Sequence, residues 1–175
     1  MTTAPSIDRM IVRYLGALGP ASVMDAHDWS GLTRLGEVFE RLRPGLVTFR
    51  TEGGRELFDV PDTPRADADV RAPIRFVPQY DNLLLGHADR SRIIPAAIAA
   101  LPWPSVWVGS ILVDRMAGGI WRVDDAGLTA TIVVEPRVTL TPAQRVEVES
   151  EAASLVAFLR PNAAGHGVRF VDSTA

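Results

Sequence analysis

The residues most able to perform chemistry lie in one short polar segment that follows a predicted strand. Four of them are expected to line a small pocket: Tyr80, Asp81, Asn82 and His87. Asp81 is able to act as a general base or to orient a water molecule. The pattern favours another role, in which Asp81 and Asn82 cap a turn or the start of a helix over Leu83–Leu85. Asp81 is therefore a weak catalytic candidate, and the sequence offers no stronger one.

Two further pairs of residues in this segment have alternative interpretations. His87 and Asp89 are able to bind a metal or relay protons, but a metal site needs at least a third ligand at a matching spacing. A polar loop is the favoured interpretation, and neither a metal nor another cofactor is predicted. Arg90 and Arg92 are suited to hold phosphates, or equally to pair with nearby carboxylates.

The elements before this segment form a small helical module over residues 6–60. Ser6 is the expected cap of a first helix, whose apolar residues recur with the helical period and end at Gly19–Pro20. Ser22 and Asp25 have the spacing of a capping box for a second helix. Thr33 is the expected cap of a third. The apolar stripe of the first helix is Ile7, Met10, Ile11, Tyr14, Leu15 and Leu18.

A β-hairpin is expected after the third helix. Gly53–Gly54 is typical of a two-residue loop with positive φ angles. Pairing outward from that loop places Phe49 opposite Phe58 and Val47 opposite Val60, with these side chains on one face.

Three helices followed by a hairpin make a winged helix, which is able to place its third helix in the major groove of DNA. The expected phosphate contacts are Arg34, Arg41, Arg43, Arg50 and Arg55, together with Arg90 and Arg92. Against this, residues 1–60 hold 7 arginines and 8 acidic residues. A protein–protein interaction module without nucleic-acid binding is the alternative.

The rest of the chain indicates an α+β protein. Residues 61–73 are rich in proline and charge and are interpreted as a linker. Residues 74–175 are expected to form an antiparallel, barrel-like sheet covered by a C-terminal helix that Thr141 and Gln144 cap. Trp103, Trp107 and Trp121 are interpreted as core residues, although exposed tryptophans are able to stack on bases.

Composition excludes several classes of protein. The chain has no cysteine, so disulfides and thiolate chemistry are excluded, as fits a reducing cytoplasm. No apolar run is long enough to span a membrane, and the N-terminus lacks the pattern of a secretory signal. All 18 basic residues are arginines, yet the net charge is −3, which argues against a dominant nonspecific nucleic-acid footprint.

Three stretches together resemble one family: RYLGALGPASVMDAHDWSGLT, FVPQYDNLLLGHADRSRIIP and GSILVDRMAGGIWRV. They are similar to the C-terminal half of winged-helix DNA-binding proteins related to the AlkZ/YcaQ-like DNA glycosylases. The resemblance covers about residues 7–160 and implies tandem winged helices, a β-barrel and double-stranded DNA as the partner.

In that family, excision of alkylated bases depends on a Gln-x-Gln or Gln-x-Asp motif in the N-terminal half, which this chain lacks. The resemblance therefore implies a DNA-binding remnant without independent catalysis, a truncated member, or a fragment that needs a partner chain to supply the missing half. A homo-oligomer is the other expected assembly. A minimal glycosylase that uses Asp81 is the enzymatic alternative.

Overall fold

The computed structural model describes residues 6–64, 67, 69–101 and 107–172. The chain folds as two compact units, which are described separately below. The first unit comprises residues 1–68 and 82–90, and the second comprises residues 69–81 and 91–175. Residues 82–90 belong to the first unit, where they hydrogen-bond to the helices, and the predicted domain boundaries around residues 61–73 stay a prediction.

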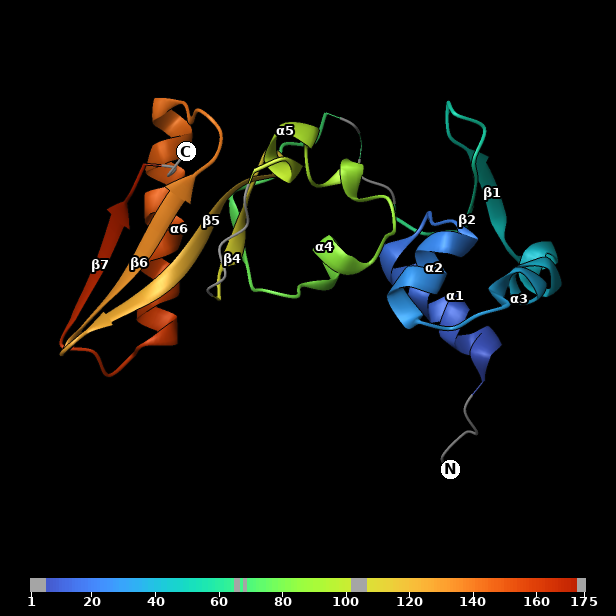
Figure 1. The fold of residues 1–175 in the computed structure, drawn as a ribbon, viewed down its shortest axis with the longest axis horizontal. Coiled ribbons are helices and arrows are strands. Elements are labelled where there is room, and N and C mark those ends of the chain that lie inside the picture. Colours follow the sequence, from blue (N-terminus) through green and yellow to red (C-terminus); the bar gives the residue numbers. More distant parts are fainter. Residues whose placement is uncertain (1–5, 65–66, 68, 102–106, 173–175) are drawn as a thin grey trace. The chain divides into compact units, whose positions relative to one another are not determined.

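The first unit begins with three helices: α1 (Ile7–Leu18), α2 (Val23–Ser30) and α3 (Leu35–Leu42) (Figure 1). The predicted cap at Ser6 and the capping box of Ser22 and Asp25 are both confirmed. The predicted cap at Thr33 is wrong. Arg34 precedes α3 in the left-handed region, with φ of 60°, and makes no side-chain cap.

The core of this unit lies where the three helices meet the hairpin. Ile11, Leu15 and Phe39 are fully buried, and Phe39 contacts the ring of Phe58 edge-on at 4.9 Å. The predicted apolar stripe of α1 is buried only in part, since Ile7 is 49% exposed. The outer edge of α1 is therefore open in this unit.

The hairpin consists of β1 (Val47–Arg50) and β2 (Glu56–Asp59), which follow the short turn η1 (Arg43–Gly45). The predicted register is wrong by one residue, because Phe49 pairs with Leu57 and Val47 pairs with Asp59. Of the two glycines only Gly54 has a positive φ. The Thr51 amide donates to the Arg55 carbonyl and the Gly54 amide donates to the Thr51 carbonyl, so the loop has three residues instead of two. Phe58 consequently faces the core, whereas Phe49 is 36% exposed.

The second unit is built on a five-stranded sheet in the order β3-β4-β5-β6-β7. The strands are β3 (Arg75–Val77), β4 (Gly109–Val113), β5 (Met116–Ala126), β6 (Thr129–Pro136) and β7 (Gly165–Phe170). Among the described strands the sheet is open, with β3 and β7 at its edges, so the barrel-like expectation is not met.

The expectation of a wholly antiparallel sheet is also wrong, because β7 pairs parallel to β6. The 18-residue helix α6 (Pro142–Leu159) connects these two strands and returns the chain to the same end of the sheet. Its predicted capping box of Thr141 and Gln144 is confirmed. Figure 1 shows α6 along the sheet, where Val148, Ala152 and Val156 pack on Ile132 and Val134.

Three short helical segments lie between β3 and β4: α4 (Asn82–Leu85), η2 (Arg90–Arg92) and α5 (Ala96–Ala99). The chain is thus a mixed α+β protein, as predicted. Among the described residues, no helix has both the length and the apolar character needed to cross a bilayer.

Candidate nucleic-acid interface

The four predicted pocket residues are divided between the two units. Tyr80 and Asp81 belong to the second unit, whereas Asn82 and His87 belong to the first. Each pair is therefore described within its own unit, and a single pocket made by all four remains a prediction.

In the first unit, segment 82–90 is fastened to α1 and α2 by hydrogen bonds. The hydroxyl of Tyr14 donates to the carbonyl of Gly86 at 2.7 Å, and the indole of Trp29 donates to Asn82 Oδ1 at 3.4 Å. Position 86 favours glycine because a Cβ there would lie 2.7 Å from the backbone carbonyl oxygen of Asn82 and 2.7 Å from a methyl of Leu18. Asn82 therefore helps to attach the segment to the helices.

Asp25 is the central anchor of this segment. Its carboxylate is 1% exposed and accepts from the Ser22 amide and hydroxyl, both at 2.7 Å, and from the Ala88 amide at 2.9 Å. Burial acts to raise the pKa of Asp25, but the hydrogen bonds from Ser22 and Asp89, with the charge of His87, lower it overall. The sequence identified Asp25 only as a capping residue and missed this second role.

His87 also serves the attachment. Its Nε2 lies 2.9 Å from the carbonyl oxygen of Leu18, and since a carbonyl only accepts, Nε2 must carry a proton. Asp89, its proposed companion, forms an ion pair with Arg55 at 3.3 Å. Among the described residues, no group of three His, Cys, Asp or Glu side chains is arranged to hold a metal ion. The segment behaves as a structural loop in this unit.

Three of the predicted phosphate-binding arginines are engaged with carboxylates. Arg41 makes a bidentate pair with Asp8, with its Nε at 3.1 Å from Oδ2. Arg55 pairs with Asp89, as described above. These carboxylates compete with a phosphate for the same guanidinium donors.

Arg43 is the most heavily bonded of the three. It donates to both oxygens of Glu40 on α3 and both oxygens of Glu56 on β2, at 2.6–3.0 Å, and lies over the ring of Phe58. Its hydrogen bonds lower the pKa values of Glu40 and Glu56 and raise its own. Arg43 thereby ties α3 to the hairpin.

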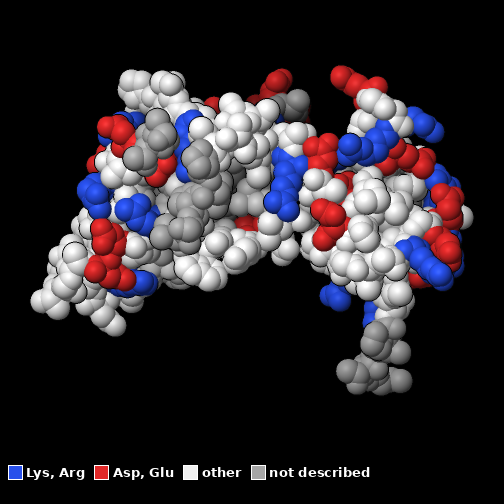
Figure 2. All heavy atoms as spheres, in the orientation of Figure 1, with Lys and Arg blue, Asp and Glu red and all other residues white. Residues whose placement is uncertain are grey.

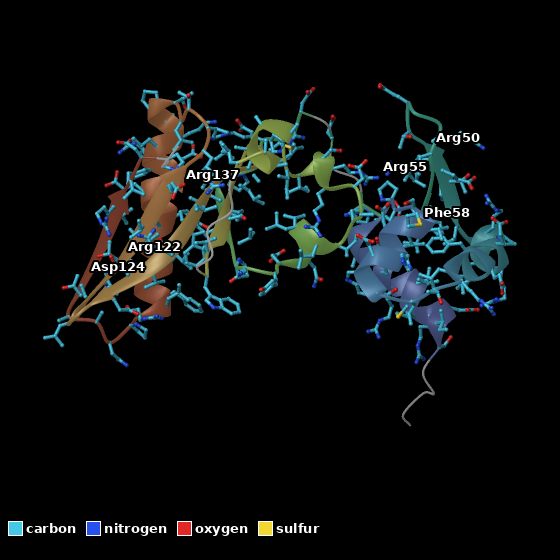
Figure 3. The ribbon with its side chains drawn as sticks, in the orientation of Figure 1. Arg50, Arg55, Phe58, Arg122, Asp124 and Arg137 are labelled. Atoms are coloured by element: carbon cyan, nitrogen blue, oxygen red, sulfur yellow. The ribbon has the colours of Figure 1, made fainter. Side chains whose placement is uncertain are left out.

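Arg34 and Arg50 differ from these three. Both are exposed, and neither forms an ion pair with any described residue. Arg34 stands at the start of α3, and Arg50 lies at the end of β1, near Arg55 and above the buried Phe58 (Figure 3). The guanidinium of Arg50 donates to the Gly54 carbonyl at 3.5 Å, and its charge helps to lower the pKa of Glu56.

The remaining two predicted arginines lie in the short turn η2. Arg90 belongs to the first unit and Arg92 to the second, and both are exposed. On the face drawn in Figure 2, basic and acidic side chains alternate over the first unit. Phosphate contact by any of the seven arginines therefore remains a prediction.

A groove of about 640 Å³ runs along the outer side of α1 and was not predicted. Its lining includes Met10, Tyr14 and Trp29, together with the basic residues Arg9 and Arg13. The signal that could have revealed it is the wide apolar stripe on α1. That stripe presents more apolar surface than the other two helices and the hairpin are able to cover.

In the second unit, the three tryptophans have different outcomes. Trp121 is half-buried, as predicted, and donates to the Val77 carbonyl at 3.0 Å. Trp107 is 75% exposed, so the core interpretation is wrong for it. Trp103 lies outside the described residues.

Comparisons with known proteins decide the family. The family described as DNA glycosylase AlkZ-like matches residues 2–158. The chain belongs to the AlkZ-like DNA glycosylase family. Its fold is similar to that of the Streptomyces sahachiroi DNA glycosylase AlkZ, with a TM-score of 0.70 and 24% sequence identity over 97% of this chain. Comparison with curated proteins finds no match.

The chain spans 47% of the Streptomyces AlkZ. The chain also contains one Gln-x-Asp sequence, which the sequence interpretation overlooked. Gln79, Tyr80 and Asp81 satisfy Gln-x-Asp, although they lie in a turn after β3. The Oε1 of Gln79 is buried and has no hydrogen-bond partner among the described residues. The role of Asp81 as a weak catalytic candidate stays a prediction.

Proposed function

We propose that this chain is a DNA-binding portion of an AlkZ-like glycosylase, which binds duplex DNA but does not excise a base by itself. Membership of the family supports a repair-related role. The order of three helices and a hairpin in the first unit is that of a winged helix, with α3 as the recognition helix and β1–β2 as the wing.

The observation that carries the proposal is the position of Arg34 and Arg50. One begins the proposed recognition helix and the other lies on the proposed wing, and neither forms an ion pair with a described residue, although the charge of Arg50 helps to lower the pKa of Glu56, which it faces across the hairpin. Arg90, exposed in the same unit, is a third candidate. Arg41, Arg43 and Arg55 are assigned to holding the unit together, and Arg92 lies in the other unit.

Anisotropy of a labelled duplex, measured over a series of salt concentrations, tests this assignment. Each arginine that contacts a phosphate contributes about 1 to the slope of log affinity against log salt. The double variant Arg34→Ala, Arg50→Ala should therefore lower the slope by about 2. The matched control Arg145→Ala, Arg160→Ala removes two arginines from the second unit and should leave the slope unchanged.

Two outcomes would contradict the proposal. Equal effects of the test and control variants would show that only net charge matters. Absence of duplex binding at low salt, where phosphate contacts are strongest, would favour a protein–protein interaction module instead.

A separate experiment tests whether the chain excises a base by itself. It is needed because the Gln-x-Asp sequence is compatible with the alternative of a minimal glycosylase. Duplex DNA that carries an alkylated base is incubated with the chain and then treated with alkali to cleave abasic sites. No cleavage is expected. Cleavage that disappears in Asp81→Asn would establish catalysis by this chain and refute that part of the proposal.

In this proposal, base excision requires the half of an AlkZ-like protein that the chain does not span. Sedimentation of the purified chain with and without duplex distinguishes a monomer from a homo-oligomer.

A further inference from the structure

Two aromatic side chains meet at the end of the sheet where β3 stops and β4 begins. In the antiparallel pair, Val77 lies opposite Ser110. Counting three residues onward from Val77 and three back from Ser110 brings Tyr80 opposite Trp107. The rings do meet, with centroids 5.7 Å apart and planes at 84°, which is an edge-to-face contact.

This pair is held at the surface rather than in the core. Tyr80 is 64% exposed and Trp107 is 75% exposed. The nearby pair of Phe76 and Trp121 has a similar edge-to-face geometry at 5.8 Å, but both of its members are half-buried and pack on the core. The sheet end therefore has one aromatic pair that serves packing and one that remains open to solvent.

The backbone at Tyr80 is in a conformation that a bulky residue rarely adopts. The Asp81 amide donates to the Pro78 carbonyl at 3.3 Å, so Tyr80 is the third residue of a β-turn, and its φ is 64°. Turns with a positive φ at this position favour glycine or asparagine. The neighbouring Gln79 buries its Oε1 atom, which has no hydrogen-bond partner in the described part of the chain. Two unfavourable features in consecutive residues indicate that the ring of Tyr80 is retained for contact with a ligand.

We infer that Tyr80 and Trp107 form a stacking site for an unpaired nucleobase of DNA. This inference rests on the proposed DNA-binding function. It adds a site that binds the face of an unstacked base, whereas the arginines bind the phosphate backbone. Every base has a flat face, so such a site tolerates any sequence, and its contribution depends on access to an unstacked base. A fully paired duplex keeps its bases stacked and offers no such face.

The test compares three labelled DNA probes of the same sequence: a single strand, a duplex with an unpaired bulge, and a fully paired duplex. Trp107→Ala and Tyr80→Asn each remove one ring, and asparagine tolerates the positive φ at position 80. Each variant should weaken binding of the single strand and the bulged duplex by about tenfold, with the paired duplex unchanged. Quenching of tryptophan fluorescence by the single strand should be lost in Trp107→Ala.

Two controls separate stacking from damage to the fold. Trp107→Phe keeps an aromatic face and should retain most of the binding. Phe158→Ala removes an aromatic side chain that is 80% exposed on α6 and should have no effect. Circular dichroism of each variant confirms that the unit is folded.

The outcomes distinguish this inference from the proposed function. Binding of all three probes with wild-type affinity by both ring variants would overturn the stacking site, whose rings would then serve a polypeptide contact, and would leave duplex binding intact. Ring-dependent binding of the single strand without binding of the paired duplex would support the site and refute the proposed function. Binding of none of the probes would refute both.

Discussion

Replacement of Asp25 by asparagine should release segment 82–90 and destabilise the first unit. Asparagine has nearly the same shape, but only one of its two terminal atoms accepts hydrogen bonds. Asp25 uses both oxygens, since Oδ2 accepts from Ser22 and Oδ1 accepts from the Ala88 amide. Whichever way the asparagine amide turns, its NH₂ group faces a buried donor.

The size of the effect follows from the number of donors left unpaired. A buried donor without an acceptor costs about 1–3 kcal/mol. One or two such donors at this site give an expected loss of about 2–4 kcal/mol in the free energy of unfolding of the first unit. Local opening should be favoured as well, so the amides of Ala88 and Asp89 should exchange hydrogen at least about tenfold faster.

The acid dependence of stability provides an independent check. The pKa of Asp25 is lower in the folded chain than its ordinary value. Its contribution to stability is therefore complete above the unfolded pKa and is lost as the pH falls through the folded pKa. The wild-type chain should lose stability in acid more steeply than Asp25→Asn, and the two should converge at low pH.

Urea unfolding and hydrogen exchange measure these quantities, and Asp28→Asn is the matched control. Asp28 lies on the same helix but is exposed, so its replacement should change the unfolding free energy little. A wild-type urea midpoint for Asp25→Asn, or unchanged exchange at Ala88 and Asp89, would refute the anchoring role of this carboxylate.

Three further substitutions test other parts of the structure. Arg43→Ala should lower the thermal midpoint of the first unit more than Arg34→Ala does, because only Arg43 links Glu40 of α3 to Glu56 of β2; equal midpoints would count against that link. Arg137→Met should cost about 3–5 kcal/mol in urea unfolding, because the side chain is 5% exposed and its loss leaves the carboxylate of Glu135, 13% exposed, without its cation. The double variant Arg137→Met, Glu135→Gln should recover part of that loss, and no recovery would argue against the pair. Gly109→Ala should cost about 1–3 kcal/mol because its Cβ would overlap the Trp121 indole, whereas Gly45→Ala, with open space around it, should not; a tolerated Gly109→Ala would mean that the indole moves freely.

Local signals in the sequence predicted local structure well. The capping boxes at Ser22 and Thr141 are short-range patterns, and both helices begin where these patterns indicate. The hairpin shows the limit of such signals. Two glycines in a row are compatible with a two-residue or a three-residue loop. The loop length sets the register of the two strands, and the register sets which side of β2 faces the core.

Long-range pairings were not predictable from local patterns. The direction of β7 depends on where α6 returns the chain, and alternation along the strand is the same in either direction. Tyr14 bonds to Gly86 across 72 positions, and Trp29 bonds to Asn82 across 53. The residue types of segment 82–90 suggested chemistry, but its polar side chains instead attach the segment to α1 and α2.

The charge pattern of the first unit changes what its arginines are able to do for binding. A phosphate that binds Arg41 must displace or share the carboxylate of Asp8, and one that binds Arg43 must compete with two glutamates. In each such exchange the arginine loses its ion pair with a carboxylate and gains one with a phosphate. The exchange therefore adds little to the affinity for DNA or to the salt dependence of that affinity. Arg34 and Arg50 face no such competition from an ion pair among the described residues. If the proposed function holds, a duplex affinity that depends on a few guanidinium groups outside ion pairs should be weak by itself.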